Sequence, residues 1–127
     1  MLWTFFSFYV IDHRECIHPR IPNLAIPGYA DSPANIYTTE MKCRWLAHFL
    51  AGKFKLPSIR DMEEDVIGWE KCKRRYARSN YKRHCAIALL QIYTNDLLFN
   101  DMGYNPIRKS CFFADLFAPY GPADYKI

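Results

Sequence analysis

IHPRIPNLAIPGYADSPANIYTTEMKCR, residues 17–44, joins a short apolar segment to a polar loop and an amphipathic segment. Prolines flank Asn23–Ile26, and proline is tolerated at the ends of a strand but not within a central ladder. The pattern predicts a short, buried strand that ends at Gly28. Because the chain offers no sheet for this strand to join, we interpret the chain as part of a larger fold.

The amphipathic segment after the loop predicts a well-defined helix. Thr38 or Thr39 suits its N-cap, Glu40 would follow in the first turn, and Gly52 with Pro57 would end it. The larger apolar residues of this helix fall on one stripe that requires a partner surface. They are Met41, Trp45, Leu46, Phe49 and Leu50.

Further elements are expected on both sides of this helix. A second helix should run from about Ser58 to Tyr76, with acidic residues before basic ones, as the helix dipole favours. A third, Tyr81–Asp101, is apolar almost all round, which is typical of a helix inside a larger body. Prolines and glycines in the tail leave room for a short helical turn near Ala114–Phe117. Residues Trp3–Ile11 suit a strand on propensity alone.

Composition narrows the class of protein. The 127 residues have a formal charge of +4 with 13 acidic residues, a balance that does not by itself indicate a nucleic-acid partner. The five cysteines are odd in number and form no CxxC pair, so we expect free thiols and a reducing compartment, the cytoplasm. The apolar opening is shorter than the ~20 residues of a membrane span and lacks a basic n-region, so we expect no span.

Four segments taken together resemble the C-terminal end of plant-type flavin-containing monooxygenases. They read IHPRIPNLAIPGY, TTEMKCRWLAHFLAGKFKLPSIRDMEEDV, YTNDLLFNDMGYNPIRK and FAPYGPADY, and they follow one another in the family's order from about Arg14 to Tyr125. The resemblance implies an α/β fragment, mostly helical, with one or two short strands and about three helices, from the end of an FAD-binding dinucleotide fold. It divides the chain into a divergent segment 1–13, a returning strand and flavin-facing helix 14–57, and a helical cap and tail 58–127.

The same resemblance implies the cofactors and the contacts with them. The family uses FAD and NADP(H) to oxygenate a small-molecule substrate. By resemblance, the loop after Gly28 should pass near the flavin, and the cofactor-binding residues would be Gly28, Tyr29, Ser32, Asn35 and Thr38. Pro27 departs from the aliphatic residue usual before this glycine and removes a backbone donor. We assign no catalytic residue.

Both GxGxxG nucleotide loops of the family are missing from this sequence. We therefore expect a fragment that is not catalytic alone, from a truncated or alternatively started gene product, which another chain could complete. The alternative is a non-enzymatic module whose basic run, Lys71 to Arg83, binds an acidic partner or RNA. Salt-dependent binding without flavin would favour that alternative.

Other chemically suggestive groups have simpler interpretations. His13, Cys16 and His18 lack a fourth ligand at zinc-site spacing, so we expect a solvated turn and no metal. Cys43 and His48 lie five residues apart on one helix, too far around its axis for a nucleophile and its base, so Cys43 should serve packing. The acids from Asp61 to Asp65 fit a helix's first turn, and we give them no catalytic role.

Overall fold

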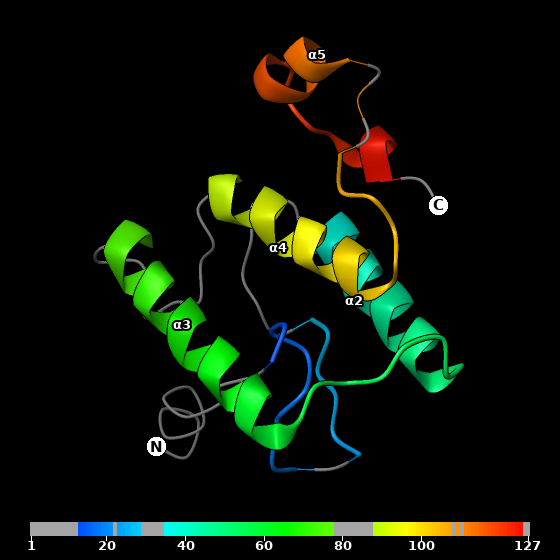
Figure 1. The fold of residues 1–127 in the computed structure, drawn as a ribbon, viewed down its shortest axis with the longest axis vertical. Coiled ribbons are helices and arrows are strands. Elements are labelled where there is room, and N and C mark those ends of the chain that lie inside the picture. The colour runs from blue at the N-terminus through cyan, green and yellow to red at the C-terminus, as the bar shows by residue number, and fades with distance from the viewer. Residues whose placement is uncertain are drawn as a thin grey trace.

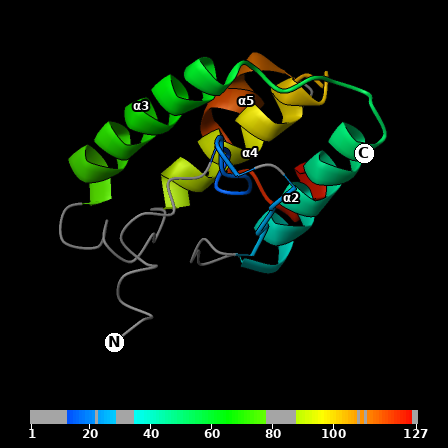
Figure 2. The same cartoon turned by 90° about the horizontal axis from the view of Figure 1, so that it is seen from below.

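The computed structural model describes residues 13–21, 23–28, 35–77, 88–107, 109 and 111–125. Within these ranges the chain is mostly helical, as predicted. Its helices are α2 (Asn35–Leu50), α3 (Ile59–Ala77), α4 (Ala88–Asp101), the short α5 (Phe112–Phe117) and the 3-10 helix η2 (Pro122–Tyr125). Helix α2 packs against α4, and the blue segment that begins at His13 lies between this pair and α3 (Figures 1 and 2).

The predicted strand at Asn23–Ile26 does not form. Ile17 instead makes two isolated antiparallel bridges, one to His13 and one to Ala25, and the Ile26 N–H donates to the Cys16 carbonyl at 2.7 Å. A ladder needs a neighbouring strand, and the described ranges contain none. The sheet part of the α/β prediction is therefore not observed here, and the second candidate strand, Trp3–Ile11, lies outside the described residues.

Helix α2 begins at Asn35, so the prediction of an N-cap at Thr38 or Thr39 was wrong, as was the placement of Glu40 in the first turn. A tertiary contact accounts for the extra turn. The hydroxyl of Tyr37 accepts a hydrogen bond of 2.9 Å from the Asn95 side chain on α4, which fixes the start of α2 against its partner. The end of α2 was predicted correctly, since Gly52 has a φ of 71° and closes a Schellman turn with Lys53.

Helices α3, α4 and α5 also lie close to their predicted positions. Ser58 caps α3, because its hydroxyl accepts a hydrogen bond from the Asp61 N–H at 3.2 Å and donates one to the Asp61 carboxylate at 2.7 Å. Helix α4 ends at Asp101 as expected, while residues 81–87 of the predicted helix lie outside the described part. Helix α5 begins two residues before the predicted turn, with Cys111 as its N-cap.

One hydrophobic core joins α2, α3 and α4 to the segment at His13. Its buried members are Cys16, Ile17, Met41, Trp45, Met62, Leu98 and Phe99. Met41 and Trp45 confirm the inner edge of the predicted stripe on α2, but Leu50 is exposed. Phe113 and Phe117 of α5 are exposed as well, so the described residues supply no surface that buries these two aromatic side chains. None of the helices described combines the length and apolar character needed to cross a bilayer.

Candidate functional site

The most unusual local structure is a tight turn at His13–Ile17, which we call the charged turn. Arg14 and Glu15 have φ values of 57° and 51°, a left-handed backbone conformation that residues other than glycine rarely adopt. Three backbone hydrogen bonds of 2.8 to 3.2 Å between His13, Cys16 and Ile17 close the turn. This conformation directs consecutive charged side chains into the space between the helices, and their ion pairs offset its strain.

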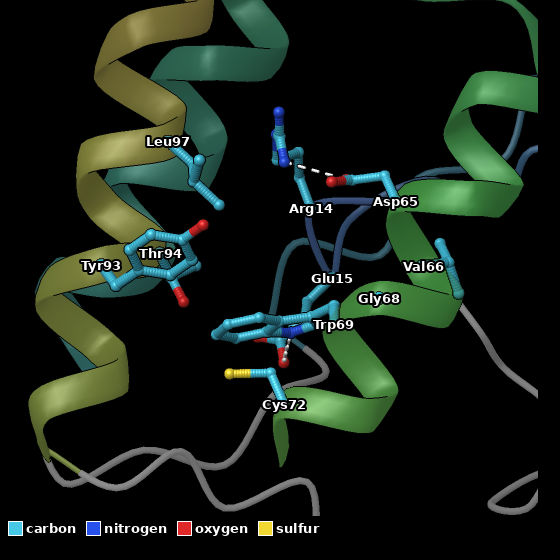
Figure 3. Close-up of a pocket in the computed structure, with 10 residues that line it drawn as sticks. All are labelled: Arg14, Glu15, Asp65, Val66, Gly68, Trp69, Cys72, Tyr93, Thr94 and Leu97. Carbon is cyan, nitrogen blue, oxygen red and sulfur yellow. Dashed lines mark hydrogen bonds and ion pairs between the residues drawn. The ribbon is translucent and has the colours of Figure 1, made fainter. Parts of the chain in front are cut away.

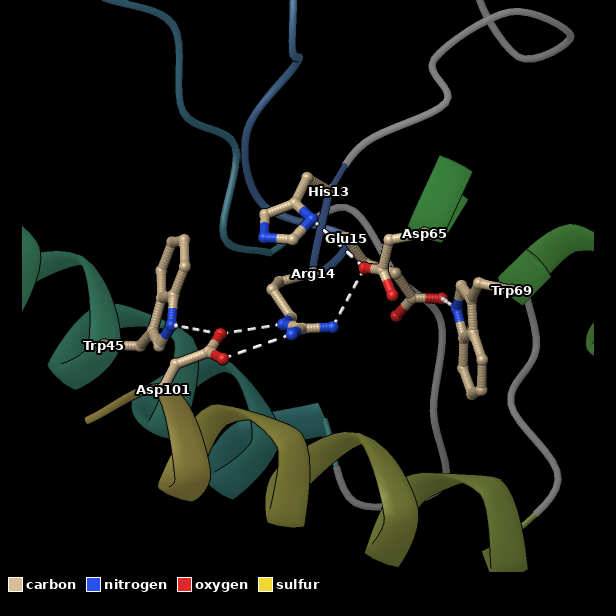
Figure 4. A network of polar contacts seen from close by, with 7 residues as sticks. All are labelled: His13, Arg14, Glu15, Trp45, Asp65, Trp69 and Asp101. Atoms are coloured by element: carbon tan, nitrogen blue, oxygen red, sulfur yellow. Dashed lines mark hydrogen bonds and ion pairs between the residues drawn. The ribbon is translucent and has the colours of Figure 1, made fainter. Parts of the chain in front are cut away.

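Arg14 links two helices through a bidentate ion pair and a single one (Figure 4). Its Nε donates to Asp101 Oδ2 at 2.7 Å and its Nη2 to Asp101 Oδ1 at 3.1 Å, at the end of α4. Its Nη1 donates to Asp65 Oδ2 on α3 at 2.9 Å. The indole N–H of Trp45 on α2 also donates to Asp101, at 3.0 Å. One side chain thus ties α3 to α4 and, through Asp101, to α2.

Glu15 makes a second set of links on the same turn. It accepts from the Lys42 ammonium on α2 at 3.1 Å and from the Trp69 indole N–H on α3 at 3.2 Å. Lys42 and Glu15 are both buried, so this pair lies in surroundings where unpaired charge is strongly unfavourable. The sequence reasoning missed the charged turn, although the four consecutive ionisable residues from Asp12 to Glu15, just before Cys16 and Ile17, were its signal.

His13 completes the cluster, and the prediction of a solvated turn at His13, Cys16 and His18 was wrong for its first two members. His13 is 1% exposed and Cys16 is fully buried. The Nδ1 atom of His13 lies 3.1 Å from Asp65 Oδ2, but neither ring nitrogen makes an aligned hydrogen bond. Among the described residues no group of His, Cys, Asp or Glu could hold a metal ion. His13 is therefore part of the polar centre of the fold.

Acid should destabilise the fold through His13. Burial lowers the pKa of His13 below its ordinary value of 6.5, and the neighbouring Arg14 cation lowers it further, against opposing effects of Asp65 and Asp101. As pH falls through 6.5, the unfolded chain binds a proton at His13 before the folded chain does. The free energy of unfolding should therefore fall as pH drops from 7.5 to 5.5, and the full loss is reached below the folded pKa.

Urea unfolding at these two pH values measures the effect. In a His13→Gln variant the free energy of unfolding should differ less between the two pH values, because glutamine at position 13 does not titrate. An equal difference in the variant and the parent chain would contradict this assignment.

The predicted cofactor residues are only partly described. Gly28 lies beside α2, where an added Cβ would lie 3.9 Å from the Thr39 methyl, an ordinary contact, so the fold itself does not require glycine here. Asn35 is the first residue of α2, and Thr38 lies a turn into that helix and is 6% exposed. Tyr29 and Ser32 lie outside the described residues.

The cysteines and the basic run Lys71 to Arg83 are the remaining candidates from the sequence. Cys43 is exposed, so its predicted packing role was wrong. Cys16, Cys72 and Cys111 are, like Cys43, free thiols. In the basic run, α3 ends at Ala77 with Lys71, Arg74 and Arg75 exposed, and Arg74 pairs with Glu70 at 3.6 Å. Lys73 lies in α3 as well, whereas Arg78, Lys82 and Arg83 lie outside the described residues.

Sequence comparison relates the chain to three monooxygenases. The probable flavin-containing monooxygenase 1 of Arabidopsis thaliana is 41% identical over 115 residues, which are 91% of this chain and 21% of that protein. The putative flavin-containing monooxygenase 2 of the same plant is 37% identical over 74% of this chain and 20% of its own length. The chain matches flavin-containing monooxygenases. An FAD-dependent monooxygenase of Fusarium langsethiae is 28% identical over 82% of the chain and 18% of its own length.

The predicted resemblance to flavin-containing monooxygenases is thereby confirmed. The chain spans about a fifth of the length of these curated relatives. No protein-family model and no solved structure matches the chain. The alignment with the first of these relatives covers 91% of the chain, so the similarity is not confined to any one of the four segments quoted above.

Proposed function

We propose that this chain forms the C-terminal part of the FAD domain of a flavin-containing monooxygenase. The observation that carries the proposal is 41% identity across 91% of the chain, against only 21% of the relative. The parent reaction would use NADPH and O2 to oxygenate a small molecule, with the flavin supplying the oxygen chemistry. The free thiols at the four described cysteines suit a reducing compartment such as the cytoplasm.

The flavin would lie against the start of α2 and the loop before it. Gly28, Tyr29, Ser32, Asn35 and Thr38 are the proposed cofactor-binding residues. Two features support this choice. The first turn of α2 contains no acidic residue, so nothing there opposes the attraction of its N-terminal N–H groups for an electron-rich ring. An added Cβ at Gly28 would make only an ordinary contact with its own chain, so we attribute the glycine to the close approach of a group from outside the chain.

The chain should not oxygenate a substrate alone, because the fold that holds the cofactor is incomplete. A dinucleotide fold presents FAD at the ends of parallel strands, and the described ranges contain isolated bridges in place of a sheet. Four apolar side chains near the proposed flavin site are exposed, with Ile36 the most exposed at 89%. These are Ile21, Leu24, Ile26 and Ile36. We propose that the remaining part of a monooxygenase fold, supplied by another chain, covers them.

The purified chain tests the first half of this proposal. It should be colourless, and its melting temperature should not change with added FAD, because ligands stabilise only the proteins that bind them. Stoichiometric flavin together with NADPH oxidation would overturn the statement that the chain is inactive alone.

Co-expression with the Arabidopsis flavin-containing monooxygenase 1 lacking its region of similarity tests the second half. The purified pair should contain FAD, and a Gly28→Trp variant should lower the flavin content because its side chain would fill the proposed site. If the pair forms without flavin, or the flavin content is equal with and without this chain, the FAD-domain assignment is wrong.

A further inference from the structure

A cavity lies between α3 and α4, with the charged turn as its floor (Figure 3). Its volume is about 260 Å³, slightly below the range of roughly 300 to 1,000 Å³ that is usual for ligand pockets, so it suits only a small molecule. Arg14 and Glu15 come from the charged turn, while Trp69 and Tyr93 come from the two helices. Neither Gly28 nor Thr38 lines it, so it is separate from the proposed flavin site.

Two aromatic rings form one wall of the cavity. The Trp69 and Tyr93 rings are stacked with centroids 5.8 Å apart and planes inclined by 27°. Trp69 is held in place by its indole N–H bond to Glu15, so the wall does not need to be ordered by a ligand. Val66 and Leu97 add apolar surface. The cavity thus offers aromatic and aliphatic contacts to a small ring.

The polar side of the cavity is acidic. Of its charged lining residues Arg14 is a cation, whereas Glu15 and Asp65 are carboxylates. The donors of Arg14 are directed to Asp101 and Asp65, and Lys42 and Trp69 donate to Glu15. Asp65 Oδ2 accepts from Arg14 and lies 3.1 Å from His13 Nδ1, while Asp65 Oδ1 has no partner among the described residues. The Asp65 side chain is 42% exposed, so its Oδ1 atom is an acceptor available to a bound donor.

We infer that this cavity binds a small aromatic amine. The ring lies against Trp69 and Tyr93, and the protonated amine donates to Asp65. A cation near aromatic faces gains a further electrostatic attraction, and a charge-assisted hydrogen bond is stronger than a neutral one. An aromatic carboxylate is excluded by repulsion from Glu15 and Asp65. This site is independent of FAD binding.

Benzylamine is the probe that tests the site on the full chain. It should shift the Trp69 indole N–H signal saturably in ¹H–¹⁵N spectra. It should also slow alkylation of Cys72, which lines the cavity, by iodoacetamide, while the exposed Cys43 and Cys111 react unchanged. Benzyl alcohol, which lacks the charge, should bind about tenfold more weakly. Benzoate should produce neither effect.

Gly68 provides matched variants that keep the helix intact. It lines the cavity, and no described atom lies within 4 Å of an added Cβ. Leucine and alanine both favour a helix over glycine, so Gly68→Leu and Gly68→Ala should fold at least as well as the parent chain. Gly68→Leu should abolish both benzylamine effects by filling the cavity, and Gly68→Ala should retain them.

Three results would overturn the inference. One is the absence of any saturable shift with the parent chain. Another is benzoate or benzyl alcohol acting as strongly as benzylamine. The third is benzylamine slowing the alkylation of Cys72 in the folded Gly68→Leu variant as much as in the parent chain, since this effect of benzylamine would then arise outside the cavity.

Discussion

Replacing Arg14 with methionine should remove most of the stability of this fold. Arg14 pairs with Asp101 and Asp65, and its own side chain is only 12% exposed. Removing one partner of a buried ion pair costs roughly 3 to 5 kcal/mol, and the loss of Arg14 leaves Asp101, which is 23% exposed, and Asp65, which is 42% exposed, without their shared cation. A domain of this size has a total stability at the low end of about 5 to 15 kcal/mol. The loss is therefore comparable to the whole stability of the chain.

The effect should be visible in more than one helix. Asp101 also accepts from Trp45 on α2, so a displaced carboxylate weakens the packing of α2 on α4. Urea unfolding followed by circular dichroism and by tryptophan fluorescence measures the change. The variant should show a much lower midpoint by both probes, or no cooperative transition at all.

Arg20→Met is the matched control for this variant. Arg20 also pairs with a carboxylate of α3, Glu63, through two of its nitrogen atoms, but its side chain is 71% exposed. Exposed ion pairs contribute little because water screens both charges. The control should unfold at the midpoint of the parent chain. Equal midpoints for the two variants would show that Arg14 does not hold the helices together.

Local signals explain why most helices could be predicted. Ser58 carries its own capping interaction with Asp61, and Gly52 supplies the left-handed residue that ends α2, so each boundary depends on neighbours in sequence. The start of α2 was predicted wrongly, because its first turn depends on the hydrogen bond that Tyr37 accepts from Asn95 on α4, a helix distant in sequence. The prediction of the short strand was wrong for a related reason, since a strand forms only when it pairs with a neighbouring strand of a sheet.

The candidate site was harder to predict because it is made of long-range contacts. Arg14 meets Asp65 and Asp101, which lie 51 and 87 residues away along the chain. An acid in the first two turns of α3 has an ordinary explanation in the helix dipole, which hid the role of Asp65. Lys42 follows Met41 on a helix whose apolar stripe suggested that charged residues would face solvent. Sequence similarity identified the family, but it did not identify this polar centre.

The buried pair of Lys42 and Glu15 gives the second large prediction. Lys42→Met removes an ammonium that lies 3.1 Å from the Glu15 carboxylate, where both side chains are at most 10% exposed. The carboxylate keeps its charge and loses its cation, so the free energy of unfolding should fall by roughly 3 to 5 kcal/mol. Glu15→Gln alone should be destabilising as well, because it leaves the buried ammonium facing a neutral amide.

The double variant Glu15→Gln with Lys42→Met should be more stable than the Lys42→Met variant. Replacing both members of a buried ion pair by neutral side chains of similar volume is often close to neutral, and glutamine can still accept from the Trp69 indole N–H. Urea unfolding of the four chains in this cycle gives the coupling energy between the two residues. Arg44→Met, which breaks an exposed pair with Glu40 on the same helix, should change stability by less than about 0.5 kcal/mol. A double variant whose loss equals the sum of the two single losses would show that the charges do not interact, and the charged turn would then be held by its backbone and by Arg14.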